Sequence, residues 1–404
     1  MWLVVLGIVL FILLIILHEY GHFLVAKRNG VDVEEFGVGF PPKIYGRKLG
    51  KGIFEGYYTV NLLPLGGFVR LKGEHDADKA KGSFGSVGTK AKLRIMLAGV
   101  AVNFVAALVV FTILAWIGMP QVVPNQFTVP SDTKVLRDDF ITGLVVSDSP
   151  AYKSGLTSGD IIRTFGPNTI YTQEDIRTAA EQNAGQIVEI TYERNGELKT
   201  TMSTINTTEQ AMQAGEKLAN EAKAKGRISE VNQQTIEDYA SYFGLAGTRY
   251  QLNQSTWSAP VVAVGLSGQF SWLTLKAVGT ALANLAKAFV GLITLNANEA
   301  KQDAAKAGEN VAGPVGIFAI LQQGSDLGFQ FVLFVVGVLS LTLAIMNALP
   351  IPALDGGRAF VMLTFRALKK PLSADLEDRI HGTGFAILML LFVVIVIVDV
   401  NRFY

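Results

Sequence analysis

Long apolar segments most constrain the fold of this chain. Residues 2–17 form an almost uninterrupted apolar run, which continues across a short polar insert to residue 26. Similar runs occur at about 93–119, 328–349 and 384–398, and a helix of about 20 apolar residues can span a bilayer. Only 17% of the 404 residues are charged, against about 25% in soluble domains. The sequence predicts a multi-pass α-helical membrane protein with about four transmembrane helices.

Composition excludes cysteine chemistry and gives no support for a nucleic-acid partner. The chain has no cysteine, which excludes disulfides, cysteine zinc sites and thiol catalysis. Its net charge of +1 gives no electrostatic case for a nucleic-acid partner. No positive charge precedes the first apolar run, so we expect that run to be a membrane helix rather than a cleaved signal peptide. The expected partner is the lipid bilayer.

Basic residues predict the orientation. They gather in the two connections that follow the first and third apolar runs: Lys27, Arg28, Lys43, Arg47, Lys48, Lys51, Arg70, Lys72, Lys90, Lys92 and Arg94 in one, and Arg358, Arg366, Lys369 and Lys370 in the other. Short basic connections stay in the cytoplasm. We therefore expect a protein of the cell's inner (plasma) membrane whose long polar segment, about 120–270, is extracytoplasmic.

Four regions follow from these patterns. Residues 1–119 are predicted to form an N-terminal membrane core, and 120–205 a small α/β domain with a hairpin turn at Asn195-Gly196. Residues 206–270 indicate a helical insertion and linker. Residues 271–404 indicate an amphipathic helix followed by a C-terminal membrane core, and the pattern leaves open whether that helix spans the membrane or lies on it.

A glycine-rich region lies between the first two spans. Residues 36–42 and 57–69 alternate as strands do and are too apolar for a solvated loop. Non-helical backbone at membrane depth must pack on protein or line a cavity. We therefore expect a re-entrant β-hairpin region, whose edge could pair with an unwound substrate segment.

The motif that carries chemistry is His18-Glu19-Tyr20-Gly21-His22. On a helix, two histidines four residues apart lie about 40° apart around the axis, so both imidazoles can bind one zinc ion. Glu19 would then act as the general base on a water bound to the metal. Charged groups in a transmembrane helix are costly, so they indicate a functional site.

A catalytic zinc needs a third protein ligand. Asp355 is the candidate, because Pro350 and Pro352 should end the third span near the same membrane face. The alternative is that Asp355 caps the next helix. Asn103 and Asn347 are lone amides in apolar helices, and they either join helices or position the substrate. His75 and His381 are expected to face solvent and have no role.

Together these stretches resemble the site-2 protease family of intramembrane zinc metalloproteases, in its bacterial form with a PDZ domain. The matching segments come in the family's order: residues 18–22, 64–68, 73–74, 98–103, 313–317 and 347–357, with the PDZ likeness strongest at 149–166. Val100 stands where the family usually has proline, and the stretch 206–250 has no counterpart.

The resemblance implies a function. His18, His22 and Asp355 would be Zn²⁺ ligands, Glu19 the catalytic base, and Asn347 a residue near the scissile bond. The family cleaves transmembrane segments of membrane proteins, often after a first cut by another protease, and its PDZ domain filters or binds substrates. Two alternatives remain at this stage: an inactive PDZ scaffold, which would not need Glu19, and a metal transporter.

Overall fold

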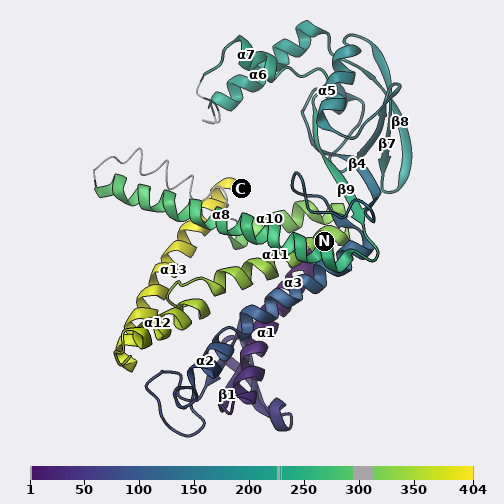
Figure 1. The fold of residues 1–404 in the computed structure, drawn as a ribbon. Coiled ribbons are helices and arrows are strands. Elements are labelled where there is room, and N and C mark those ends of the chain that lie inside the picture. The colour runs from purple at the N-terminus through teal and green to yellow at the C-terminus, as the bar shows by residue number, and fades with distance from the viewer. Residues whose placement is uncertain (1, 225–227, 229, 294–312, 404) are drawn as a thin grey trace. The chain divides into compact units, whose positions relative to one another are not determined.

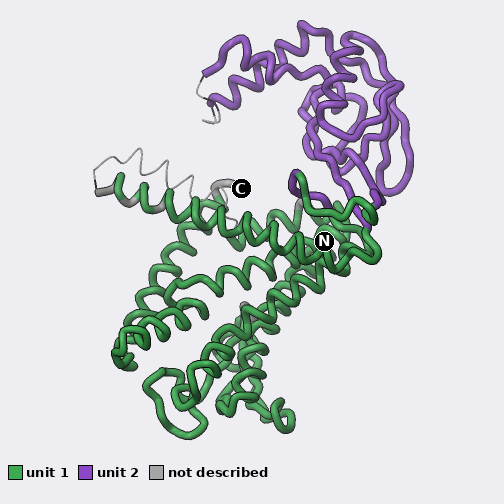
Figure 2. Tube along the Cα trace, viewed as in Figure 1, with its two compact units in different colours: residues 1–119, 125–133, 255–404 green, residues 120–124, 134–254 purple. Residues whose placement is uncertain are grey.

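The computed structural model describes residues 2–224, 228, 230–293 and 313–403 (Figure 1). The chain divides into two compact units, shown in Figure 2. Unit 1 comprises residues 1–119, 125–133 and 255–404, and unit 2 comprises residues 120–124 and 134–254. We describe each unit by itself.

Unit 1 is built from long apolar helices. Five of its described helices have the length and composition to cross a membrane: α1 (Trp2–Arg28), α3 (Ala98–Ile117), α8 (Ala259–Ile293), α11 (Phe329–Ala348) and α13 (Ala374–Phe403). Four of them cover the predicted runs. The fifth, α8, corrects a boundary, because the helix expected from residue 271 begins at Ala259. Pro260 lies in the first turn, where its missing N–H interrupts no helical hydrogen bond, so the helix extends back through the apolar residues 261–266.

Glycines and aromatic rings bring the helices of unit 1 together. Helix α3 packs against α1, α8 and α11. A Cβ at Gly21 of α1 would lie 3.0 Å from the Ala98 carbonyl oxygen of α3, so this residue has to be small. Phe111, Phe270 and Phe334 join α3, α8 and α11, with ring centroids 5.6–6.2 Å apart.

A small sheet follows α1. The helix ends at Arg28, and Gly30 just beyond it has a φ of +78°, which favours glycine. Strands β1 (Val33–Leu49) and β2 (Gly56–Leu71) then pair, and residues Phe36–Val38 find partners in β2 both at Tyr58–Val60 and at Gly67–Val69. The predicted strands at 36–42 and 57–69 therefore lie within one two-stranded sheet, which packs against α1.

Short helices complete unit 1. Helix α2 (Thr89–Met96) precedes α3, α10 (Pro314–Gly324) precedes α11, and α12 (Asp355–Ala367) follows it. An apolar cluster joins α2, α12, the end of α1 and the loop before α2. Its buried members are Ala26, Val31, Phe84, Ile95, Met96, Ala359 and Met362.

Unit 2 is an α/β domain. Its sheet has the order β3 (Met119–Pro120), β9 (Leu245–Gln254), β4 (Lys134–Val145), β5 (Ile161–Phe165), β7 (Ile187–Arg194) and β8 (Glu197–Thr204), with β6 (Asn168–Thr169) beside β5. Helices α4 (Pro150–Lys153) and α5 (Gln173–Gln182) are capped by Ser149 and Thr172. Phe140, Ile162, Phe165 and Ile190 lie at the centre of the core.

Two predicted boundaries of this region are wrong. The α/β domain does not end at residue 205, because β9 follows the insertion and pairs with β4 along its whole length. The insertion itself forms α6 (Thr208–Ala224) and α7 (Gln233–Asp238), which pack together. Residues 259–270, predicted to be linker, are the first part of α8 in unit 1. Strand pairing between distant segments decides where the α/β domain ends, and no local pattern encodes it.

Candidate metal centre

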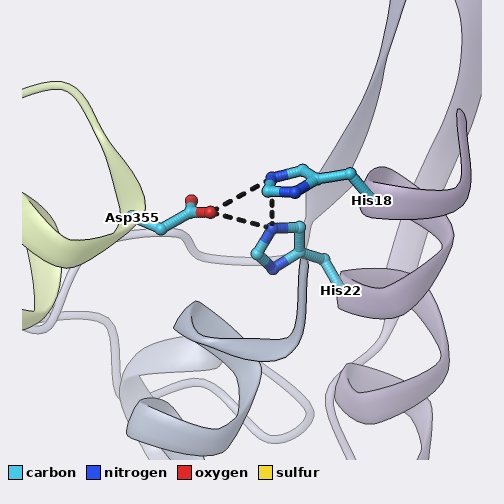
Figure 3. Close-up of side chains that lie close together, drawn as sticks. All are labelled: His18, His22 and Asp355. Atoms are coloured by element: carbon cyan, nitrogen blue, oxygen red, sulfur yellow. Dashed lines mark hydrogen bonds and ion pairs between the residues drawn. The ribbon is translucent and has the colours of Figure 1, made fainter. Parts of the chain in front are cut away.

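Three predicted ligand residues meet in unit 1. The Nε2 atoms of His18 and His22 lie 3.3 Å apart, and each lies 3.2 Å from Oδ2 of Asp355. Figure 3 shows the carboxylate of α12 pointing at the two imidazole rings of α1. These three residues are the one group of potential metal ligands that the described part of the chain brings together.

The donor set fits zinc. Ligand atoms about 2.0–2.1 Å from a tetrahedral ion lie about 3.3–3.4 Å from one another, close to the 3.2–3.3 Å found here. Apart from the two imidazoles, Asp355 Oδ2 has no donor among the described residues although it is buried. Two histidines and one carboxylate also leave a fourth position open, as catalytic zinc sites do.

The turn before α12 places Asp355. Helix α11 ends at Ala348, before Pro350 and Pro352, and the chain then folds back tightly. A Cβ at Gly356 would lie 2.2 Å from the Ala348 carbonyl oxygen, and one at Gly357 would lie 1.9 Å from that of Ile351. The N-cap of α12 is Leu354, and Asp355 is its first helical residue. Asp355 is therefore not the N-cap of this helix, and its side chain faces the histidines.

Helix α3 closes the other side of the centre. An ideal Cβ at Gly99 would lie 2.5 Å from Nε2 of His22 and 2.6 Å from Nε2 of His18. Any side chain at this position would displace the imidazoles. Gly99 lies in the segment 98–103, which matches the family, but its residue type alone predicts no role. Its position four residues before Asn103, on the same helix face, was the available signal.

The outer nitrogens of both imidazoles have polar neighbours. Nδ1 of His22 lies 2.7 Å from the Ile95 carbonyl oxygen, which is available because α2 ends at Met96. Nδ1 of His18 lies 3.3 Å from the side-chain nitrogen of Asn103, which is fully buried. Sequence reasoning missed Ile95, since a backbone acceptor leaves no trace in the residue type.

Glu19 and Asn347 face a common cavity. A cavity of about 230 Å³ is lined by Glu19, Asn347, His18, Asp355 and Asn103, with the apolar residues Ile15, Leu343 and Leu354 and with Ala353. Strand β2 approaches from the side, since a Cβ at Gly67 would lie 3.5 Å from Cγ of Glu19. The cavity offers space next to both the candidate base and the three candidate ligands.

An ionic cluster lies in the loop before α2. Lys92 is fully buried, and its ammonium donates to Asp76 at 2.5 Å and to the Gly85 carbonyl at 3.0 Å. Arg366 of α12 donates to the same carboxylate at 3.0 Å. Partial burial alone would raise the pKa of Asp76, but these two cations bring it below its usual 3.8. The cluster ties α2 to α12, the helix that carries Asp355.

The two remaining histidines were expected to face solvent, but each has a polar partner in the structure. His75 pairs with Asp378 at 2.9 Å, and this hydrogen bond raises the pKa of His75 above its usual 6.5. Nδ1 of His381 accepts from the backbone N–H of Ala353 at 3.2 Å, in the turn before Asp355. Neither lies among the ligand group.

Comparison with known proteins shows a zinc metalloprotease of the site-2 type, and the long apolar helices and the candidate metal centre agree with it. Residues 6–391 match the model of Peptidase family M50, so the chain belongs to that family. It is 30% identical to a Clostridium perfringens protein named as a candidate zinc metalloprotease, over 98% of both chains.

Two named bacterial proteases are also similar over nearly their whole length. The zinc metalloprotease RasP of Shouchella clausii is 25% identical, and the regulator of sigma-W protease RasP of Bacillus subtilis is 26% identical, each over 98% of both chains. Family membership does not favour the scaffold and transporter alternatives.

Proposed function

We propose that this protein hydrolyses peptide bonds within transmembrane segments of membrane proteins, with His18, His22 and Asp355 as its zinc ligands. The observation that carries the proposal is the meeting of these three side chains beside Glu19, on helices apolar enough to span a bilayer. A peptidase of this kind needs both features, since its substrates lie in lipid.

Each residue has a chemical task. Bound zinc lowers the pKa of a water molecule towards about 7 and polarises a carbonyl oxygen. Glu19 lies beside the ligands and faces the cavity, so its carboxylate can take the proton of the attacking water and pass it to the leaving amine. Asn347 faces the same cavity, where its amide can hydrogen-bond the substrate backbone.

The sheet edge beside Glu19 suits a substrate that has lost its helical hydrogen bonds. Residues Gly67–Leu71 of β2 pair with β1 on one side, and Gly67 lies next to Glu19. An extended segment could add to this sheet through backbone hydrogen bonds. Helix-breaking residues in the substrate would favour this binding, because an amide within an intact helix is shielded by its own turn.

Charge supports one orientation. The basic residues that follow α1 and α11 favour a cytoplasmic location for both connections, and with them for the candidate metal centre, at the plasma membrane. If α1, α3, α11 and α13 span, α8 and α11 begin on the same side, so a spanning α8 would need a return crossing. We propose four spans, with α8 embedded in the membrane or lying along it.

With this orientation, we propose that unit 2 is an extracytoplasmic PDZ domain. Its capped turn at Ser149, its strand at Ile161–Phe165 and its helix α5 occupy the segment that resembles PDZ domains. In that position it would meet the outer part of a substrate, before or after a first cut by another protease.

The test is cleavage by wild type and by Glu19→Gln in lipid vesicles. The substrate is a tagged single-span protein with glycine and proline in its helix, and bound zinc is measured in both proteins. We expect about one zinc in each and at least a 10²-fold lower rate for Glu19→Gln. Equal rates would remove Glu19 as the base. Absence of zinc in wild type would contradict the ligand assignment.

A further inference from the structure

We propose that Asn103 is a positioning residue of the metal centre: its side-chain carbonyl accepts the Nδ1 proton of His18 and thereby directs Nε2 of His18 at the zinc ion. The inference rests on the proposed function and adds to it a residue of α3 that is not itself a zinc ligand. It gives Asn103 a role towards His18 rather than towards the scissile bond.

The starting observation is an unpartnered buried atom. The side chain of Asn103 is fully buried, with its nitrogen 3.3 Å from Nδ1 of His18. Its oxygen Oδ1 is also buried and has no hydrogen-bond partner among the described residues. Rotating the side-chain amide of Asn103 by half a turn exchanges its oxygen and nitrogen within the same volume and presents Oδ1 to His18. The exchange leaves the position of the helix unchanged.

The ligand chemistry decides which arrangement holds zinc. A neutral imidazole carries one proton, on one of its two nitrogens. A ring that binds metal through Nε2 must therefore be protonated on Nδ1, and that proton needs an acceptor. The amide nitrogen of Asn103 cannot accept it, whereas Oδ1 can. The same position of the side chain is thus compatible with the metal only when its oxygen faces His18.

His22 shows the corresponding arrangement with a different acceptor. Its Nδ1 lies 2.7 Å from the carbonyl oxygen of Ile95, an atom that can only accept, so the proton is on Nδ1 and Nε2 is free for a metal ion. Ile95 and Asn103 lie on either side of the junction between α2 and α3. One segment of the chain would therefore orient both histidine ligands.

A hydrogen bond to α11 fixes the backbone of Asn103 in the position needed to orient His18. Its backbone carbonyl accepts the hydroxyl proton of Ser340 in α11 at 2.8 Å, and Ser340 is itself fully buried. The contact fixes α3 against α11 at the level of Asn103. Ser340 also supplies a control, because its loss changes this helix contact without removing the amide.

The experiment measures zinc affinity of the full-length protein in detergent, by competition with a chelator. Asn103→Leu keeps the size of the side chain and removes the acceptor, and we expect a 10- to 100-fold weaker affinity, as for other outer partners of metal-binding histidines. Asn103→Asp restores an acceptor and should stay within a few-fold of wild type. Ser340→Ala should also stay close to wild type, and His18→Ala should lose the site.

Two outcomes overturn the inference while leaving the proposed function intact. One is wild-type affinity in Asn103→Leu together with loss of zinc in His18→Ala. The other is equal weakening in Asn103→Leu and Ser340→Ala, which would show a packing effect. If wild type itself binds no zinc, the proposed function fails first.

A second measurement needs no variant. In the zinc-loaded protein labelled with ¹⁵N-histidine, the nitrogen shifts of His18 should show a protonated Nδ1 and a metal-bound Nε2. A protonated Nε2, or binding through Nδ1, would contradict the role of Asn103 even if every variant failed to fold.

Discussion

The buried carboxylates of unit 2 and the carboxylate of the candidate metal centre in unit 1 have different partners. In unit 2, the buried carboxylate of Asp160 accepts two bonds from Arg194, at 2.6 and 2.7 Å, and one from the Thr157 backbone at 2.8 Å. Asp139 is likewise buried and pairs with Arg137 and Arg163. Both carboxylates are thus paired with guanidinium groups of the same unit, which offsets the cost of their burial.

The metal centre of unit 1 shows the opposite arrangement. Oδ2 of Asp355 meets only two imidazole nitrogens, and Oδ1 of Asn103 has no partner among the described residues. Buried acceptors without donors are costly, and a cation offsets this cost. The difference teaches that satisfied carboxylates hold a fold together, whereas converging unsatisfied ones indicate a ligand site.

We expect the largest loss of zinc affinity from Gly99→Ala, which tests whether the metal centre depends on the space beside the two imidazoles. The added methyl group would lie about 2.5 Å from atoms of both histidines, so the imidazoles must move. We expect zinc affinity and proteolysis each to fall by more than about 100-fold, with the folding of unit 2 unchanged. Gly268→Ala in α8 is the matched control, because a Cβ there meets nothing within 4 Å. Retained zinc in Gly99→Ala would disprove the crowding argument.

An intermediate effect is expected from Phe165→Ala in unit 2. Phe165 is fully buried and packs edge-on against Phe243, with ring centroids 5.0 Å apart. Its loss should destabilise unit 2 by about 3–5 kcal/mol, seen as faster backbone hydrogen exchange in β5 and β7. Zinc stoichiometry should not change, since the ligands belong to unit 1. Leu198→Ala, at an exposed position, should alter neither property, and zinc loss in Phe165→Ala would show that the units depend on each other.

The smallest effect concerns pH. The bond to Asp378 raises the pKa of His75 above 6.5. This contribution to stability is therefore fully present below pH 6.5 and is lost as the pH rises through the raised pKa. His75→Gln should lower the stability of unit 1 by less than about 1 kcal/mol at pH 6 and have no effect near pH 9. Thermal unfolding at both pH values tests this, and Asp378→Asn should behave the same way. A loss of equal size at both pH values would show that packing, rather than charge, is responsible.

Much of the candidate site was predictable because its signal is local. The spacing of His18 and His22 on one helix face is written in five consecutive residues, and the apolar runs fix which segments become long helices. The prolines after Asn347 predict where α11 ends, and the structure has this end at Ala348. Periodicity and residue type encode such features without reference to the rest of the chain.

Other features required the folded chain. The pairing of β9 with β4 and the contact of Asn103 with His18 join segments that are distant in the sequence. The same holds for the tie between Lys92, Asp76 and Arg366.

The sequence by itself determined most of the long helices and the candidate zinc ligands. The tertiary structure decided that Asp355 meets the two histidines, that Gly99 leaves them room, and which polar atoms lie beside their rings. The physical reason is that a helix depends on neighbours within a turn, whereas a metal centre depends on the packing of helices whose contacting residues carry no mark of their partner.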